Sequence, residues 1–331
     1  MNFDKEAMFY EKLEDKKVQC NLCPHHCLIY ENKSGICRVR KNKDGVLYAT
    51  NYGETISFSI DPIEKKPLYH YHPSAKILSV GPNSCNFKCQ FCQNYNISQY
   101  EVPTHSITPE DILDKCKQSN VKQVAFTYTE PFTWFEFIYD TVKKLKDNDI
   151  GIVMVTNGYV EEKPLKELLP YIDAFNVDLK AMNDEFYKKV CNGSLNPILR
   201  NIKLIAASAH LEVTNLIITN NNDEKEELRK LVDFIAEINP DIPIHFSRYY
   251  PAFKMNEPPT PVSTLKQAYF IAKEKLSYVY LGNVITEKNS NTYCKECDKL
   301  LVERVGFGTK IKGIKNKRCV NCDEKIYGEW D

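Results

Sequence analysis

The sequence predicts an α/β fold in which about six strand–helix units form an open or complete parallel barrel between two cysteine-rich segments. From about residue 76, short strands alternate with helical stretches, and this alternation implies a parallel sheet. Central strands such as IVMVT and LIIT are short, apolar and β-branched, which suits strands covered on both faces. The predicted domains are an N-terminal Cys-rich module with a hairpin (1–75), a partial (β/α)6-type barrel (76–290) and a zinc-ribbon-like tail (291–331).

Four cysteines in the N-terminal module are spaced as C-x2-C-x3-C-x9-C, which is irregular for a zinc finger. They provide enough thiolates for one zinc ion or one iron–sulfur cluster, although His25 and His26 could compete as ligands. We favour zinc, because a closed structural site would fix this small module to the barrel. Further along, Asp44-Gly45 between two short apolar stretches predicts a hairpin. The four predicted ligands, for zinc or Fe–S, are Cys20, Cys23, Cys27 and Cys37.

The barrel region contains seven candidate strands and seven candidate helices. The strands are 76–80, 121–128, 150–156, 172–178, 210–219, 242–247 and 277–281. The helices are 109–119, 132–147, 163–169, 184–190, 197–208, 223–238 and 262–275, with entry signals at Thr108-Pro109 and Ser263. In such barrels, the loops at the C-terminal ends of the strands carry the chemistry. Residues 61–72 precede the barrel and form either a lid or half of the pocket wall, or else a plain connecting loop.

Three cysteines follow the first barrel strand on a single loop. The strand KILSV leads directly into GPNSCNFKCQFCQN, which contains Cys85, Cys89 and Cys92. Four thiolates normally hold a [4Fe–4S] cluster, so three leave one iron open to a substrate. The alternative is a zinc site completed by a distant histidine, but zinc motifs favour cysteines paired in knuckles. We therefore predict a [4Fe–4S] cluster on this loop, with the three cysteines as its catalytic ligands.

With Phe91 before its last cysteine, this loop resembles the signature of the radical S-adenosylmethionine (SAM) superfamily. The resemblance implies that SAM binds the open iron and is cleaved reductively to methionine and a 5′-deoxyadenosyl radical, which abstracts hydrogen from a substrate. A fuller match, in CPHHC, SGICRVR, DPIEKKPLYHYHP, TYTEP and HFSRYYP, is to the radical SAM enzymes of the AmmeMemoRadiSam system. These are similar to glycyl-radical-enzyme activases such as pyruvate formate-lyase-activating enzyme. The likeness extends from Cys20 to Trp330.

The resemblance also implies a set of cofactor-binding residues, which includes Phe91. Glu130 and the backbone of TYTEP would receive the ammonium group of SAM, although the two glycines that often precede this glutamate are absent. Asn157 follows the third strand and is a further candidate SAM contact. Asp178 and Lys180, in VDLK after the fourth strand, would lie beside the SAM carboxylate. Each of these residues could instead cap a strand end.

Two residues near the end of the sixth strand, in HFSRYYP, are predicted to have different roles. Arg248 could bind a carboxylate or phosphate of the substrate through its bidentate guanidinium. His245 is expected to be packed in the core.

The tail contains two CxxC knuckles separated by twenty-one residues, a spacing typical of a zinc ribbon. The site is closed and therefore expected to be structural, although iron could replace zinc. Basic residues between the knuckles could contact RNA or an acidic protein, but a solvated hairpin is favoured because the whole chain is neutral. The predicted zinc ligands are Cys294, Cys297, Cys319 and Cys322.

Composition restricts the remaining possibilities. Lys plus Arg and Asp plus Glu balance at 44 each, so the net charge calls for neither nucleic acid nor an anionic membrane. No apolar run approaches the roughly 20 residues that cross a bilayer, and the N-terminal segment lacks a signal-peptide core, so we expect a cytoplasmic protein. By resemblance, the partners are SAM, a reductant such as ferredoxin or flavodoxin, and other AmmeMemoRadiSam proteins. The competing hypothesis is a metal-dependent RNA- or protein-binding module without SAM chemistry, against which the open three-cysteine site argues.

Overall fold

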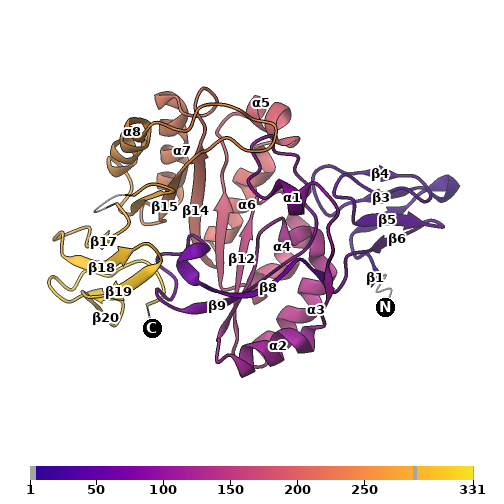
Figure 1. Ribbon diagram of the computed structural model, residues 1–331, viewed down its shortest axis with the longest axis horizontal. Coiled ribbons are helices and arrows are strands. Elements are labelled where there is room, and N and C mark those ends of the chain that lie inside the picture. The colour runs from indigo at the N-terminus through magenta and orange to yellow at the C-terminus, as the bar shows by residue number, and fades with distance from the viewer. Residues whose placement is uncertain (1–4, 286–288, 331) are drawn as a thin grey trace.

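The computed structural model describes residues 5–285 and 289–330, and an eight-stranded sheet runs through its centre (Figure 1). Seven of these strands are parallel and lie in chain order, while β8 pairs antiparallel with β9 at one edge. Strand β16 forms the other edge, so the barrel is open. The order across the sheet is β16 (Val279–Gly282), β15 (Ile244–Arg248), β14 (His210–Ile217), β13 (Ala174–Asp178), β12 (Gly151–Thr156), β11 (Gln123–Phe126), β9 (Lys76–Gly81) and β8 (Ser57–Pro62).

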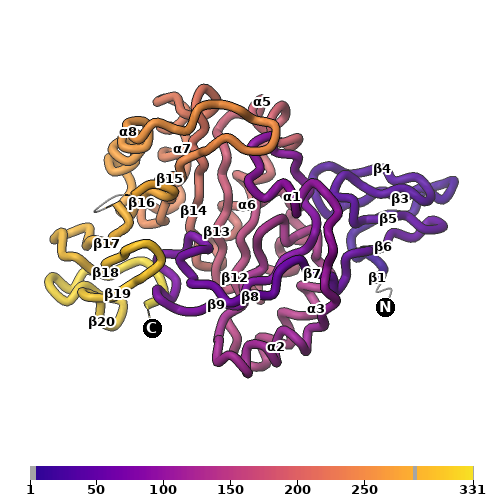
Figure 2. The backbone as a smooth tube through the Cα atoms, viewed as in Figure 1, coloured from indigo at the N-terminus to yellow at the C-terminus, as the bar shows by residue number. Residues whose placement is uncertain are grey.

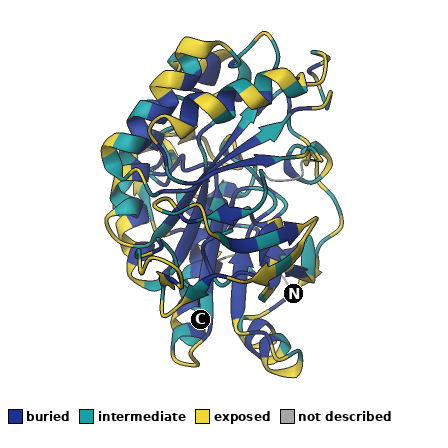
Figure 3. Ribbon diagram, turned by 90° about the vertical axis from the view of Figure 1, so that its left-hand side faces the viewer, coloured by how far each residue is buried: buried dark blue, intermediate teal, exposed yellow. Residues whose placement is uncertain are grey.

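The seven predicted barrel strands are confirmed, because each overlaps one of the parallel strands. Amphipathic helices lie outside the sheet, and Figure 3 shows their exposed faces pointing away from it. Thr108 caps the first of these helices through a reciprocal hydrogen-bond pair with Asp111, as its sequence signal predicts. Ser263 is no cap, since the last helix already begins at Val262. The longer helices are α2 (Pro109–Gln118), α3 (Phe135–Lys146), α4 (Glu162–Leu168), α6 (Asn196–Ala206), α7 (Lys225–Ile238) and α8 (Val262–Lys273), and the short ones are α1 (Tyr95–Ser98) and α5 (Asp184–Phe186).

The N-terminal module consists of two small antiparallel sheets at one end of the molecule (Figure 2). Asp44 and Gly45 form its predicted hairpin turn, and both have the positive φ values of such turns. Arg40 ties the module to α3 through two hydrogen bonds of 2.7 Å to the buried carboxylate of Glu136. The strands are β1 (Lys5–Glu6), β6 (Val46–Ala49) and β5 (Arg40–Lys43) in one sheet, and β2 (Tyr10–Lys12), β3 (Val18–Cys20) and β4 (Leu28–Ile29) in the other.

The predicted module boundary after residue 75 places β8 in the N-terminal module, whereas its hydrogen bonds join it to the main sheet. The segment after β8 runs along the base of the sheet, where the parallel strands begin. The backbone N–H groups of Tyr69 and His70 both donate to Glu212, a buried carboxylate near the start of β14, at 2.8 and 2.7 Å. Of the expectations for residues 61–72, a lid or pocket wall on the one hand and a connector on the other, the structure supports the connector.

The tail closes over this connector at the end of the molecule opposite the N-terminal module (Figure 1). Arg304 donates to the carbonyl of Tyr69 at 2.6 Å, and the N–H of Glu329 donates to the carbonyl of His70 at 2.7 Å. Nδ1 of His70 lies 2.7 Å from the carbonyl oxygen of Tyr327. The tail strands are β17 (Thr292–Tyr293), β18 (Leu300–Val305), β19 (Gly308–Ile311), β20 (Ile314–Lys315) and β21 (Arg318–Cys319).

Candidate active site

The cysteine loop (residues 82–94) leaves β9 at Gly81 and is held by the π-helical turn Tyr187–Cys191 that follows β13. The backbone N–H of Lys88 donates to the carbonyl of Cys191 at 2.8 Å, and that of Gln90 donates to the carbonyl of Val190 at 3.0 Å. Gly193 allows this close approach, because a Cβ there would lie 2.3 Å from the ring of Phe87. The three cysteines are thereby fixed at the C-terminal edge of the parallel sheet.

A cavity of about 240 Å³ lies against the loop and is walled by residues from the C-terminal end of every parallel strand. Such edges are where loops of parallel barrels assemble binding and catalytic groups. Its lining residues are Cys85, Phe87, Cys89, Phe91, Cys92, Gln93, Asn94, Ser98, Tyr128, Thr129, Asn157, Asp178, Lys180, Thr214, Leu216, Ser247 and Asn283.

Four of the six residues predicted to bind cofactor or substrate line this cavity beside the cysteines: Phe91, Asn157, Asp178 and Lys180. The Lys180 ammonium lies 3.2 Å from the Asp178 carboxylate and 5.7 Å from the centre of the Phe91 ring. The side-chain amide of Asn157 donates to Oδ1 of Asn86 at 2.9 Å and points its N–H toward the sulfur of Cys85 at 3.9 Å. An ion pair and an amide therefore stand next to the cysteine loop.

Glu130 is not among the lining residues, and its carboxylate is committed elsewhere. It accepts hydrogen bonds from the N–H of Phe132 at 3.0 Å, from the hydroxyl of Thr156 at 2.8 Å and from the N–H of Asn157 at 2.8 Å. Burial raises the pKa of Glu130 to about 7. The carboxylate thus caps the 3-10 turn Pro131–Trp134 and joins it to the end of β12, which is the capping role that the sequence offers as the alternative to SAM binding.

Arg248 also lies outside the cavity. Its guanidinium donates to the carbonyl of Thr260 at 2.8 Å and to the hydroxyl of Tyr250 at 3.0 Å. Successive residues of a strand point to opposite faces, and in β15 it is the neighbouring Ser247 that lines the cavity. His245 is packed in the core as expected, 2.6 Å from the Glu212 carboxylate.

Several lining residues were not predicted from the sequence as side-chain contacts. Tyr128 and Thr129 take the positions at the end of β11 that were assigned to Glu130. Tyr128 has a φ of 77°, a strained value for a bulky residue, and such strain is found preferentially at functional sites. Thr214, Ser247 and Asn283 complete the wall on the side of β14–β16. All five are polar, and all but Thr214 stand at or just beyond the end of a predicted strand.

The chemistry of the donor set fits a metal cluster at the loop. Burial raises the pKa of the Cys85 thiol well above its ordinary value, so the thiolate needs the compensating charge of a metal. The hydroxyl of Ser98 lies 3.2 Å from the sulfur of Cys92, and Asn157 approaches that of Cys85. Hydrogen bonds of this kind to ligating sulfurs are a feature of iron–sulfur sites.

The four tail cysteines form a second candidate metal centre. Their sulfur atoms all lie within 4.8 Å of one another, and the closest pairs are Cys294–Cys322 at 3.5 Å and Cys297–Cys319 at 3.7 Å. Four thiolates at such distances match the closed tetrahedral coordination of a single metal ion.

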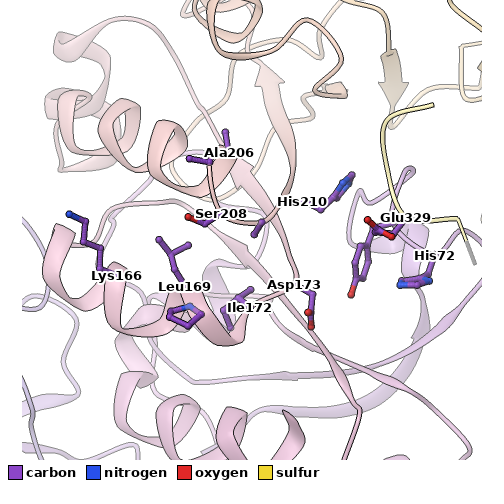
Figure 4. A pocket seen from close by; sticks show the side chains of 13 residues that line it. His72, Lys166, Leu169, Ile172, Asp173, Ala206, Ser208, His210 and Glu329 are labelled. Atoms are coloured by element: carbon purple, nitrogen blue, oxygen red, sulfur yellow. The ribbon is translucent and has the colours of Figure 1, made fainter. Parts of the chain in front are cut away.

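A larger cavity of about 860 Å³ opens at the base of the sheet (Figure 4). Lys166 and Asp173 line it from the segment before β13, Ser208 and His210 line it from the turn before β14 and from the first residue of that strand, and Glu329 lines it from the tail. No cysteine contributes to its wall. Because barrel chemistry takes place at the opposite ends of the strands, we do not assign the active site to this cavity.

A parallel sheet that carries a three-cysteine loop at its C-terminal edge is the arrangement of an enzyme with a metal cluster. Sequence comparison identifies the family to which this enzyme belongs. Residues 80–235 match the family described as the radical SAM superfamily. An uncharacterized protein of Methanocaldococcus jannaschii is 46% identical over 97% of this chain and 98% of its own length. The chain belongs to the radical SAM superfamily and is a radical SAM enzyme, and membership implies SAM and a [4Fe–4S] cluster as cofactors.

Other relatives are more distant. The 4-hydroxyphenylacetate decarboxylase activating enzyme of Clostridium scatologenes is 31% identical over 34% of this chain and 37% of its own length. A solved structure of SuiB from Streptococcus suis bound to S-adenosylmethionine aligns with a TM-score of 0.49 and 16% identity, covering 60% of this chain and 48% of that one. No helix in the described part of the chain is both long and apolar enough to span a membrane.

Proposed function

We propose that Cys85, Cys89 and Cys92 hold a [4Fe–4S] cluster whose fourth iron binds SAM, and that the enzyme abstracts hydrogen from a substrate in the adjoining cavity. When bound, the cluster supplies one electron that cleaves SAM to methionine and a 5′-deoxyadenosyl radical. The observation that carries this proposal is that the three thiols and polar residues from every parallel strand end line the same cavity.

Lys180 and Asp178 are the residues best suited to bind the methionine part of SAM. The side chain of Lys180 is largely buried, and the only carboxylate within ion-pair distance of it among the described residues is Asp178. A cation and an anion side by side match the carboxylate and ammonium groups of an amino acid through charge-assisted hydrogen bonds. Asn157 would orient Cys85, and the backbone of Tyr128 and Thr129 would take the place that the sequence suggests for Glu130.

The substrate would enter from the side of β14–β16, where Thr214, Ser247 and Asn283 offer hydroxyl and amide groups. Relatives named as activating enzymes support a protein substrate, and the motif resemblance to the AmmeMemoRadiSam system supports its other members as partners. The reductant would be a one-electron donor of the ferredoxin or flavodoxin type. The tail cysteines would hold a structural zinc ion.

The decisive experiment is anaerobic reconstitution with iron and sulfide, followed by SAM and dithionite. We expect 5′-deoxyadenosine and methionine from the natural chain, and neither from the triple variant Cys85→Ala, Cys89→Ala, Cys92→Ala. The variant Cys116→Ala is the matched control, because it removes a buried thiol on α2 that does not line the cavity. Formation of 5′-deoxyadenosine by the triple variant would refute the assignment and favour the binding-module hypothesis.

A further inference from the structure

The four cysteines of the N-terminal module, here called the N-terminal quartet (Cys20, Cys23, Cys27 and Cys37), line a single cavity although they are spread over eighteen residues. The candidate histidines beside them, of which His25 also lines the cavity, have other contacts. Nε2 of His25 lies 2.8 Å from the carbonyl oxygen of Asn86, and Nε2 of His26 lies 3.1 Å from the Glu161 carboxylate. The cavity therefore presents four thiols as its ligand set.

The spacing of these thiols differs from that of the tail cysteines. A single zinc ion binds thiolates at about 2.3 Å, which places their sulfurs about 4 Å apart. Among the described residues, the tail cysteines form the one group of three or more potential ligands that lie within 4.8 Å of one another. Although each group lines a single cavity, no three sulfurs of the N-terminal quartet lie within 4.8 Å of one another, and neither do the three sulfurs of the cysteine loop. Wider spacing suits the four irons of a cubane, each of which binds its own thiolate.

Arg40 provides an independent indication of what the cavity holds. The residue lines the cavity and is only 1% exposed, and its terminal nitrogens donate to Glu136. Its Nε, however, has no hydrogen-bond acceptor among the described residues. A buried donor without a partner costs free energy and indicates an acceptor that the protein alone does not provide. The sulfides and thiolates of an iron–sulfur cluster are acceptors of this kind.

We propose that the N-terminal quartet binds a second [4Fe–4S] cluster, fully ligated by cysteine, and not the zinc ion that the sequence favours. Four cysteines leave no iron open, so this cluster would bind no SAM. Its position is next to the active site: Asn86 lines the cavity of the quartet, directly follows Cys85 in the chain and accepts the hydrogen bond from Asn157. The claim that two clusters lie close together rests on the proposed function, because it needs the cluster on the loop. The claim that the quartet binds a [4Fe–4S] cluster does not depend on the loop.

The identity is tested on the full chain that carries Cys85→Ala, Cys89→Ala and Cys92→Ala, reconstituted anaerobically with iron and sulfide. Because the quartet is untouched, we expect about four irons and four sulfides per chain and, after dithionite, the electron paramagnetic resonance (EPR) signal of a reduced cluster. Adding Cys23→Ala and Cys27→Ala should abolish both, while adding Cys116→Ala should change neither. An iron-free triple variant with about two zinc ions per chain would overturn the proposal. This result is independent of SAM cleavage, so it separates failure here from failure of the proposed function.

The closeness of the two clusters is tested separately, by EPR. In the reduced natural chain the unpaired spins of the two clusters should interact, so its EPR spectrum should be broader than the sum of two spectra. These are the spectrum of the triple variant and that of a Cys23→Ala, Cys27→Ala variant. A natural spectrum equal to that sum would overturn the adjacent placement. If the Cys23→Ala, Cys27→Ala variant does not fold, the saturation of the EPR signal replaces this comparison. A second nearby spin speeds relaxation, so the signal of the natural chain should saturate at a higher microwave power than that of the triple variant. Equal saturation would overturn the adjacent placement.

Discussion

The carboxylate of Glu130 shows how one turn of backbone can redirect a side chain. Proline at the next position starts a 3-10 turn, and the carboxylate lies over the start of this turn, where it accepts a hydrogen bond from the N–H of Phe132. Thr156 and Asn157 donate to it from the end of β12. Glu130 therefore positions two strand ends without contacting the cavity, and its replacement should affect folding before it affects binding.

We predict that Glu130→Gln lowers the free energy of unfolding by about 1–3 kcal/mol, because the new amide N–H would face the N–H of a neighbour in a buried site. The affinity for SAM should stay near that of the natural chain. Chemical denaturation and a SAM titration of the reconstituted protein measure the two quantities. Glu162→Gln, at a half-exposed glutamate on α4, is the control and should change neither. A selective loss of SAM affinity would restore Glu130 to the binding site.

Lys180 should behave in the opposite way. Lys180→Met keeps the length of the side chain but removes the charge that we assign to the SAM carboxylate. Truncating one partner of a buried charged contact costs roughly 2–5 kcal/mol, so the Kd for SAM should rise about 30-fold or more. Iron content should be unchanged. Lys188→Met, at an exposed lysine eight residues along the chain, is the matched control. Equal affinity of the two variants for SAM would exclude Lys180 from the site.

At the level of elements, the seven parallel strands were predictable because burial on both faces leaves a continuous apolar run, as in β11 and β12. Strand β8 was not, since SFSIDP is half exposed, polar and ends in proline, which is typical of an edge strand. The same distinction applies to the site. A strand end can be located from sequence, but which of two adjacent residues faces the cavity depends on local turns and on strand orientation. For this reason Thr129 lines the cavity where the sequence suggests Glu130, and Ser247 lines it where the sequence suggests Arg248.

The tail is expected to be a separate metal-binding element. We predict that Cys297→Ser with Cys322→Ser removes about one zinc ion per chain while the iron content of the reconstituted protein is retained. These two cysteines are the less buried members of the tail group, so their replacement disturbs little packing. Metal analysis by mass spectrometry is the measurement, with Cys116→Ala as the control. Parallel loss of iron would mean that the tail and the cysteine loop are coupled.

For the whole molecule, the contact between connector and tail makes stability depend on pH. His70 is fully buried between Tyr280 and Tyr327, and burial lowers its pKa to about 3. The folded state thus binds its proton less readily than the unfolded state, whose histidine has a pKa near 6.5. The stabilisation from neutral His70 is complete above about pH 6.5 and is lost as the pH falls toward 3.

We predict that acidification from pH 7 to 5 lowers the free energy of unfolding by about 2 kcal/mol more in the natural chain than in His70→Gln, which has no titrating group at this position. Comparing the two chains cancels the acid sensitivity of the metal sites that they share. His105→Gln, at an exposed histidine, should keep the pH dependence of the natural chain. Identical pH dependence in His70→Gln and the natural chain would show that His70 does not titrate on unfolding.

Because the tail holds the connector in place, the connector of a chain emerging from the ribosome lacks these contacts until the tail has been synthesised. The carbonyl of His70 finds its partner only at the N–H of Glu329, and at 5–20 residues per second that partner is synthesised about ten to fifty seconds later. Tyr278 and Tyr280, which the tail covers in the finished protein, also lack their cover from their own synthesis until the tail has followed. A chain stopped after residue 290 should therefore be cut by protease within residues 63–75, where the full chain resists. Equal resistance would show that the base of the sheet closes without its final strands.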